Sequence, residues 1–187
     1  MSLIDEVLAR PELVERPPVL VDVGASGEIH RDWAKLAPYA LCIAFEPDAR
    51  ELGWVEKQGL GYRRLVVYRA VLTDRETESA EFHLTRSPYC SSTLRPLGDR
   101  LAPWSFHALF EVTETTLLSA VTLARVLAEQ KVERVDWFKT DSQGTDLRLF
   151  RSLGEERLVR VLAAQFEPGI LAAYEHEDTV LIDTMMG

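Results

Sequence analysis

Residues 19–33 read VLVDVGASGEIHRDW, and the order of residue types in this stretch sets the expected fold. An apolar run interrupted only by Asp22 is typical of a strand that is buried on both faces of a parallel sheet. Gly24 and Gly27 follow at once, and small residues there let a ligand approach the backbone at the start of the helix expected over 29–36. The stretch therefore predicts a strand, a loop open to close approach by a ligand, and a helix.

The rest of the chain repeats this alternation. We expect further strands at 41–45, 65–72, 80–84, 116–121, 135–138 and 159–166, and helices at 3–14, 49–58, 123–130, 145–153 and 178–186. Strands that alternate with helices predict an α/β fold, a Rossmann-like and mostly parallel sheet with helices on both faces.

The organisation along the chain predicts one domain, 1–187, with an N-terminal helical segment over 1–18. Residues 85–114 form a long irregular stretch that contains three prolines. Loops of this length inside a compact domain are often lids or binding segments, so we expect a lid that recognises a substrate. The alternative is an insertion that only covers the edge of the sheet.

Composition narrows the classes of function. The formal net charge of −9 argues against a general nucleic-acid binder, which would present a basic face. The two cysteines, Cys42 and Cys90, form no CxxC pair, which favours a reducing compartment. No signal-peptide pattern and no apolar run long enough for a membrane span is found, so we expect a cytoplasmic protein that does not bind membranes.

Acidic residues lie at the ends of most of the expected strands: Asp22, Glu46, Asp74, Asp141 and Glu167. In an open α/β sheet, ligands bind outside the carboxyl ends of the strands. Glu46 lies 22 residues beyond Gly24, near the spacing at which an acid accepts hydrogen bonds from ribose hydroxyls. The pattern predicts a pocket for a nucleoside that is joined to an anionic group.

The sequence of the glycine loop indicates which nucleoside this pocket would bind. The chain has DVGASG where dinucleotide-binding folds have GxGxxG, and a pyrophosphate is unfavourable beside a carboxylate. S-adenosylmethionine carries a carboxylate, an ammonium and a sulfonium but no phosphate. Asp22 suits its positive groups and the loop N–H groups suit its carboxylate. The alternative is a tight turn that merely requires glycine.

Five segments in order, VDVGASGE, AFEPD, AVLTD, SSTLRP and FKTDSQGTDLRLFRSLG, resemble the FkbM-type methyltransferases of the class I S-adenosylmethionine-dependent superfamily. The resemblance runs from about residue 19 to residue 167. Its most specific part is the pattern Lys-x-Asp-x-x-Gly-x-Asp/Glu, matched by Lys139, Asp141, Gly144 and Asp146. It implies methyl transfer, usually to a hydroxyl oxygen of a sugar or natural product, with S-adenosyl-L-methionine as cofactor.

The resemblance also implies roles for individual residues. It implies that the methionine portion of the cofactor binds at Asp22, Gly24, Ala25, Ser26 and Gly27. It further implies that the ribose binds at Glu46, with Pro47 and Asp48 beside it, and that the adenine binds next to Ala70 and Val71. Asp141 would face the methyl group. For catalysis we expect Asp141 as the base or orienting acceptor, tuned by Lys139. The alternative is that Lys139 only pairs with a neighbouring acid. The sequence contains no cluster of His and Cys residues of the kind that binds zinc, so we expect no metal site.

The chain departs from the family pattern in two places. Gln143 and Thr145 replace the acidic and small residues that are commonest there. Only about twenty residues follow Glu167, too few for the helix and antiparallel hairpin that end the class I sheet. We therefore expect that hairpin to be missing, and either a longer protein or another subunit, in a homo-oligomer, to cover the sheet edge.

Two rival functions remain for comparison. A methyltransferase-like binding or scaffold module without turnover is favoured by the missing hairpin and opposed by the set Asp22, Glu46 and Asp141. A nicotinamide-dependent oxidoreductase is disfavoured because both GxGxxG and a Tyr-x-x-x-Lys pair are absent.

Overall fold

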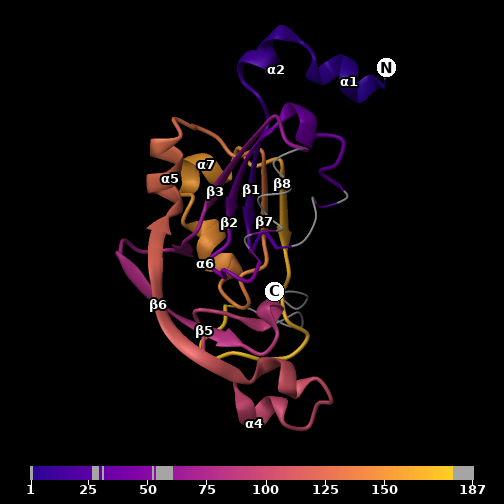
Figure 1. Ribbon diagram of the computed structural model, residues 1–187. Coiled ribbons are helices and arrows are strands. Elements are labelled where there is room, and N and C mark those ends of the chain that lie inside the picture. The colour runs from indigo at the N-terminus through magenta and orange to yellow at the C-terminus, as the bar shows by residue number, and fades with distance from the viewer. Residues whose placement is uncertain (1, 27–29, 31, 52, 54–60, 179–187) are drawn as a thin grey trace.

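The structure is a computed structural model, and it describes residues 2–26, 30, 32–51, 53 and 61–178. Within these residues the central sheet has five parallel strands in the order β3-β2-β1-β7-β8 (Figure 1). Their bounds are β1 Val19–Val23, β2 Leu41–Phe45, β3 Arg64–Tyr68, β7 Trp137–Thr140 and β8 Ala163–Phe166. The α/β, mostly parallel fold expected from the sequence is confirmed.

Both faces of the central sheet are covered, which explains why every residue of β1 and β2 is buried. On one face lie α5 (Leu123–Glu129), α6 (Asp146–Arg151) and α7 (Glu155–Leu158), which pack on Val21, Ile43 and Phe138. On the other face the segment 32–40 packs Trp33, Ala37 and Ala40 against Leu20, Cys42 and Ala44. Parallel strands need this double cover because neither face can be left to water.

A second, smaller sheet lies beyond the carboxyl ends of the central strands (Figure 1). In the described residues its order is β4-β6-β5, with β4 (Val71–Thr73) parallel to β6 (Val112–Thr122) and β5 (Ser79–Thr85) antiparallel to it. Strand β6 leads directly into α5, whose first turn is capped by the Thr122 hydroxyl accepting from Arg125 N–H. Residues 71–122 therefore leave the central sheet after β3 and return to it through α5.

Several element boundaries differ from the sequence expectations. The strand expected over 65–72 is two strands in different sheets, because the chain leaves the central sheet at Tyr68, whose carbonyl accepts from Glu46 N–H, and resumes as β4. Strand β6 begins at Val112 rather than Thr116 and strand β8 begins only at Ala163. The stretch 85–114 is less irregular than expected, since it contains the short helices η2 (Pro88–Cys90), α4 (Gly98–Leu101) and η3 (His107–Phe110).

The helical expectations also need correction. The N-terminal segment is two helices, α1 (Leu3–Leu8) and α2 (Pro11–Glu15), because Pro11 begins a helix more readily than it continues one. In place of the helix expected over 29–36, residues 32–36 form turns that lead into the 3₁₀ helix η1 (Ala37–Tyr39), where Pro38 disfavours an α-helix. Most of the helices expected over 49–58 and 178–186 lies outside the described residues.

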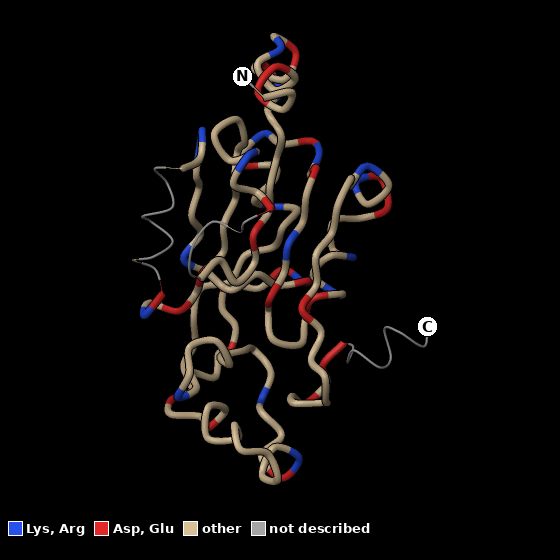
Figure 2. Tube along the Cα trace, turned by 90° about the vertical axis from the view of Figure 1, so that its right-hand side faces the viewer, with Lys and Arg blue, Asp and Glu red and all other residues tan. Residues whose placement is uncertain are grey.

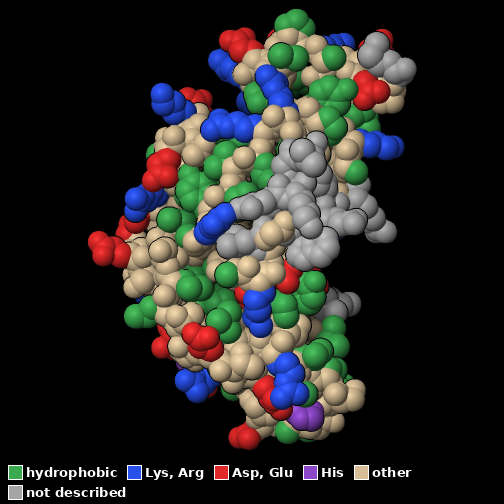
Figure 3. Space-filling model, viewed as in Figure 1, with side chains coloured by type: hydrophobic (Ala, Val, Ile, Leu, Met, Phe, Trp, Pro, Cys, Tyr) green, Lys and Arg blue, Asp and Glu red, His purple; other side chains and the backbone are tan. Residues whose placement is uncertain are grey.

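Strand β8 is the last strand of the central sheet in the described part of the chain, and no antiparallel hairpin follows it up to Asp178. On the face drawn in Figure 3, Lys and Arg side chains are interspersed with Asp and Glu rather than gathered into one basic patch. Among the described residues no helix is both long and apolar enough to cross a bilayer.

The contact between Gly24 and the residue after β7 allows a test of the fold. Gly24 has a φ of +70°, and a Cβ there would overlap the Asp141 carbonyl oxygen. We expect Gly24→Ala to lower the free energy of unfolding by more than about 3 kcal/mol, because strain and steric overlap add. Urea unfolding followed by circular dichroism measures this.

Gly154→Ala is the matched control, since Gly154 also has a positive φ, +78°, but open space where its Cβ would lie. We expect about 1–3 kcal/mol of destabilisation from the backbone strain alone. Equal losses in the two variants would contradict a steric role for Gly24.

Candidate functional site

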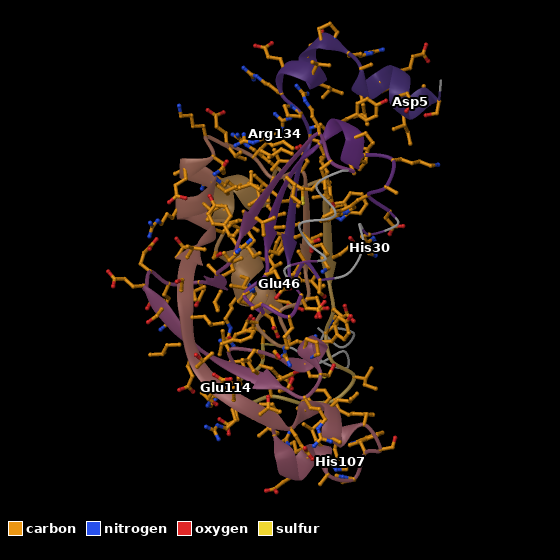
Figure 4. The ribbon with its side chains drawn as sticks, in the orientation of Figure 1. Asp5, His30, Glu46, His107, Glu114 and Arg134 are labelled. Carbon is orange, nitrogen blue, oxygen red and sulfur yellow. The ribbon has the colours of Figure 1, made fainter. Side chains whose placement is uncertain are left out.

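A cavity lies between the carboxyl ends of the central strands and the second sheet. Figure 4 shows Glu46 in this middle region of the molecule, and Figure 2 shows several acidic positions at the same level. The lining comes from several segments of the chain: Val23, Gly24, Ser26; Phe45, Glu46, Pro47, Asp48, Glu51; Ala70, Val71, Leu72; Phe82; Pro88, Tyr89, Ser91, Thr93; Asp141, Ser142, Gln143, Thr145 and Leu149.

Glu46 follows β2 and is 5% exposed. Its backbone N–H donates to Tyr68 O, and its Oε1 accepts from Asp48 N–H at 2.9 Å, so both backbone and side chain are fixed. Burial raises the pKa of Glu46 to about 7, and the nearby charges of Asp48 and Glu51 act in the same direction. The site therefore contains a preorganised carboxylate with remaining capacity to accept hydrogen bonds.

Asp48 lines the same cavity, but its carboxylate is held by Arg50. The Arg50 guanidinium donates to both oxygens of Asp48, at 2.6–3.0 Å. The same group donates to Thr85 O at 2.9 Å and to Ser91 Oγ at 3.0 Å. Arg50 thus links the end of β2 to the second sheet and leaves the Glu46 carboxylate more available than that of Asp48 as a hydrogen-bond acceptor.

Glu51 is a cavity residue that the sequence reasoning missed. It is 8% exposed, and its buried Oε2 has no hydrogen-bond partner among the residues that the structure describes. A buried carboxylate oxygen without a donor is costly, which favours a ligand that supplies the donor. Glu51 is the third acid of the segment EPDARE, which could have indicated its role. We instead assigned it to the helix expected over 49–58.

The glycine loop is held from two sides. The N–H groups of Gly24 and Ala25 both donate to Phe45 O, at 3.0 and 3.2 Å. These two donors are therefore used within the protein, whereas we had expected them to serve a ligand carboxylate. Gly24 and Ser26 line the cavity, Ala25 is buried behind it, and Gly27 lies outside the described residues.

Lys139 and Asp22 form an ion pair behind the loop. Lys139 Nζ lies 3.0 Å from Asp22 Oδ1 and donates to Gly24 O at 2.9 Å. Burial disfavours the charge of Lys139, but the carboxylates of Asp22 and Asp141 outweigh it and raise the pKa of Lys139. Neither Lys139 nor Asp22 is among the cavity-lining residues, so in this geometry the pair supports the loop.

Asp141 follows β7 and lines the cavity. Its backbone N–H donates to Val23 O at 3.0 Å, and its Oδ1 accepts from Gln143 Nε2 at 2.5 Å. Gln143, with a φ of +56°, also accepts from the Tyr174 hydroxyl at 2.9 Å. Burial, together with the charge of Glu167, raises the pKa of Asp141 to about 7.

The second acid of the Lys-x-Asp-x-x-Gly-x-Asp pattern has a different place. Asp146 is buried and accepts from the Thr140 hydroxyl, from Ser142 N–H and hydroxyl, and from Glu167 N–H. These bonds hold the loop after β7. Ser92 Oγ donates to Gln143 O at 2.8 Å from the other side, which joins the SSTLRP segment to this loop.

The remaining candidates divide between the cavity and the surface. Pro47, Ala70 and Val71 line the cavity, as do Pro88 and Tyr89 from the lid-like stretch, whereas Trp104 and His107 of the same stretch do not, nor does His30 after the glycine loop. His30 instead lies 3.6 Å from Asp32 at the surface. In the described residues no group of three or more His, Cys, Asp or Glu is placed to hold a metal ion.

The ion pair behind the loop gives a stability prediction. We expect Lys139→Met and Asp22→Asn each to lower the free energy of unfolding by about 3–5 kcal/mol, because each leaves a buried polar partner uncompensated. The double variant should recover much of the loss. Urea denaturation of the four proteins measures the coupling, with exposed Lys35→Met as a neutral control. Additive losses would mean that the two groups do not act as a pair.

Comparison with known proteins identifies the family of the chain. The sequence profile described as the methyltransferase FkbM domain matches residues 22–179, most of the chain. No curated protein and no solved structure gives a significant match. The matched region contains Glu46, Glu51, Asp141 and all other residues of the cavity. The chain therefore belongs to the FkbM methyltransferase family.

Proposed function

We propose that the protein uses S-adenosyl-L-methionine to methylate a hydroxyl group of a small molecule, a sugar or natural product. The observation that carries this proposal is the charge of the cavity. Its described lining contains the four acids Glu46, Asp48, Glu51 and Asp141 and no Lys or Arg. Such a lining disfavours ligands with phosphate groups and favours a nucleoside that carries positive charge.

The residues present fit the parts of this cofactor. Glu46 is placed to accept hydrogen bonds from ribose hydroxyls, and the orphaned Oε2 of Glu51 offers a further acceptor. Val71, Leu72 and Phe82 supply apolar surface for a purine ring. The carboxylate of Asp141 suits a neighbouring cation. These features support the cofactor assignment and leave the methionine carboxylate to be bound by groups other than Gly24 N–H and Ala25 N–H.

The protein's own residues supply alignment and proton transfer. S-adenosylmethionine supplies a methyl group activated by a sulfonium. Asp141, with a pKa near 7, is suited to accept the proton of an acceptor hydroxyl. Gln143 orients its carboxylate, and Lys139 contributes indirectly by holding the glycine loop.

Calorimetric titration tests the cofactor. We expect S-adenosylmethionine and S-adenosylhomocysteine to bind and NAD not to bind. Glu46→Ala should weaken binding of both sulfur nucleosides by about tenfold to a hundredfold, because hydrogen bonds to a charged group are lost. Glu114→Ala, at an exposed acid of β6, is the control and should bind as the wild type does. Binding of NAD alone, or of none of the three, would refute the proposal.

The raised pKa values predict opposite effects of pH on binding and stability. Glu46 has a pKa of about 7 against an ordinary 4.5, so it becomes charged between pH 6 and 8. Because the charged form accepts hydrogen bonds more strongly, affinity for S-adenosylhomocysteine should rise by up to about tenfold over that interval. Glu46→Gln should remove most of the rise.

The free energy of unfolding should change with pH in the opposite direction to the binding affinity. Glu46 and Asp141 bind protons more tightly in the folded than in the unfolded state, so unliganded stability should fall as pH rises from about 4 to about 7 and level off above. Urea unfolding at several pH values measures this. A stability that increases across this window, together with pH-independent binding, would show that these carboxyls are already charged at low pH.

A further inference from the structure

A second cavity lies directly beside the first. It is formed where the segment after β8 meets α4 and η3. Its lining is Leu101, Phe106, Phe110, Gln143, Gly144, Glu167, Pro168, Gly169, Ile170, Leu171, Ala173, Tyr174 and Glu177. Nothing in the cofactor assignment accounts for this cavity.

The walls of the second cavity are mainly apolar and aromatic. Phe106, Phe110 and Tyr174 form a row with ring centroids 6.1 and 5.7 Å apart. Trp104 stacks on the outer end of this row at 5.6 Å. Leu101 and Tyr174 are almost fully buried, whereas Ile170 is 66% exposed at the rim. Flat rings of this kind favour an occupant with a flat apolar surface.

Gln143 joins the two cavities, because it lines both of them. Its Nε2 donates to Asp141 in the first cavity, and its Oε1 accepts from Tyr174 in the second. Glu167, which lines the second cavity, is also joined to the loop after β7. It follows β8, the parallel neighbour of β7, and its N–H donates to Asp146. The Gln143 side chain therefore links Tyr174 in the second cavity to the Asp141 carboxylate in the first.

The charge of the second cavity limits its occupant further. Its described lining contains the acids Glu167 and Glu177 and no Lys or Arg. A phosphorylated or carboxylated acceptor would meet like charges in a partly desolvated space, which is unfavourable. The occupant expected from these walls is uncharged or cationic.

From these observations we propose that the second cavity binds the hydrophobic ring of the methyl acceptor, an uncharged aromatic or polycyclic alcohol whose hydroxyl reaches Asp141 beside Gln143. This inference rests on the proposed function. The acceptor oxygen forms a bond to the methyl carbon as the carbon–sulfur bond breaks, the electron pair of that bond stays on sulfur, and the hydroxyl proton passes to Asp141.

Calorimetry in saturating S-adenosylhomocysteine tests the proposal with three probes. We expect 2-naphthol to bind, and methyl α-glucoside and the anionic 6-hydroxy-2-naphthoate to bind at least about tenfold more weakly. Ile170→Asp should weaken 2-naphthol binding by about tenfold, because it places a charge at the apolar rim. Leu117→Asp is the matched control, since Leu117 is 70% exposed on β6 and lies outside both cavities.

The outcomes separate the two proposals. If S-adenosylhomocysteine binds but 2-naphthol does not, or the glucoside or the naphthoate binds as tightly as 2-naphthol, the ring-binding cavity is refuted and the proposed function stands. Equal effects of Ile170→Asp and Leu117→Asp would also refute it. If S-adenosylhomocysteine itself does not bind, both proposals fail.

Discussion

The contact on which the site depends is made by the Lys139 ammonium, which joins the Asp22 carboxylate to the Gly24 carbonyl. It links β1 to β7 at the point where both strands end. Gly24 lies so close to the Asp141 carbonyl that no side chain fits between them. The position of Asp141 in the cavity follows from this packing, as does the course of the glycine loop.

The acids of the site differ in their degree of neutralisation. Asp22 is compensated by Lys139 and Asp48 by Arg50, whereas Asp146 is fully used by backbone and hydroxyl donors. Glu46, Glu51 and Asp141 are not paired with a cation among the described cavity residues. The first group maintains the loops, and the second group gives the cavity its preference for hydrogen-bond donors and positive charge.

Much of this arrangement could be predicted from the sequence because the signals are local. Buried apolar runs predicted β1 and β2, and helical periodicity predicted α5 within a residue at its end. The strand-end position of Glu46 and the β7 loop around Asp141 follow from the same logic.

The features of the fold and site that could not be predicted from the sequence depend on contacts between distant segments. The separation of β3 from β4 appears only in the pairing of the strands, since β3 pairs with β2 and β4 with β6, and the pairing of β6 with β5 has no local signal. The link from Asp141 through Gln143 to Tyr174 spans three segments. The engagement of Lys139 with Asp22 was one of two open alternatives, because strand alternation alone does not tell which acid is nearer.

The return of the chain through β6 into α5 has a consequence for how such a protein diversifies. Residues 71–122 form an insertion between β3 of the central sheet and the capped start of α5, which packs on that sheet. Its outer part, around α4 and η3, contributes walls to the second cavity but no residue to the first. Changes of length or sequence in that outer part can therefore reshape the second cavity while the first cavity keeps its geometry.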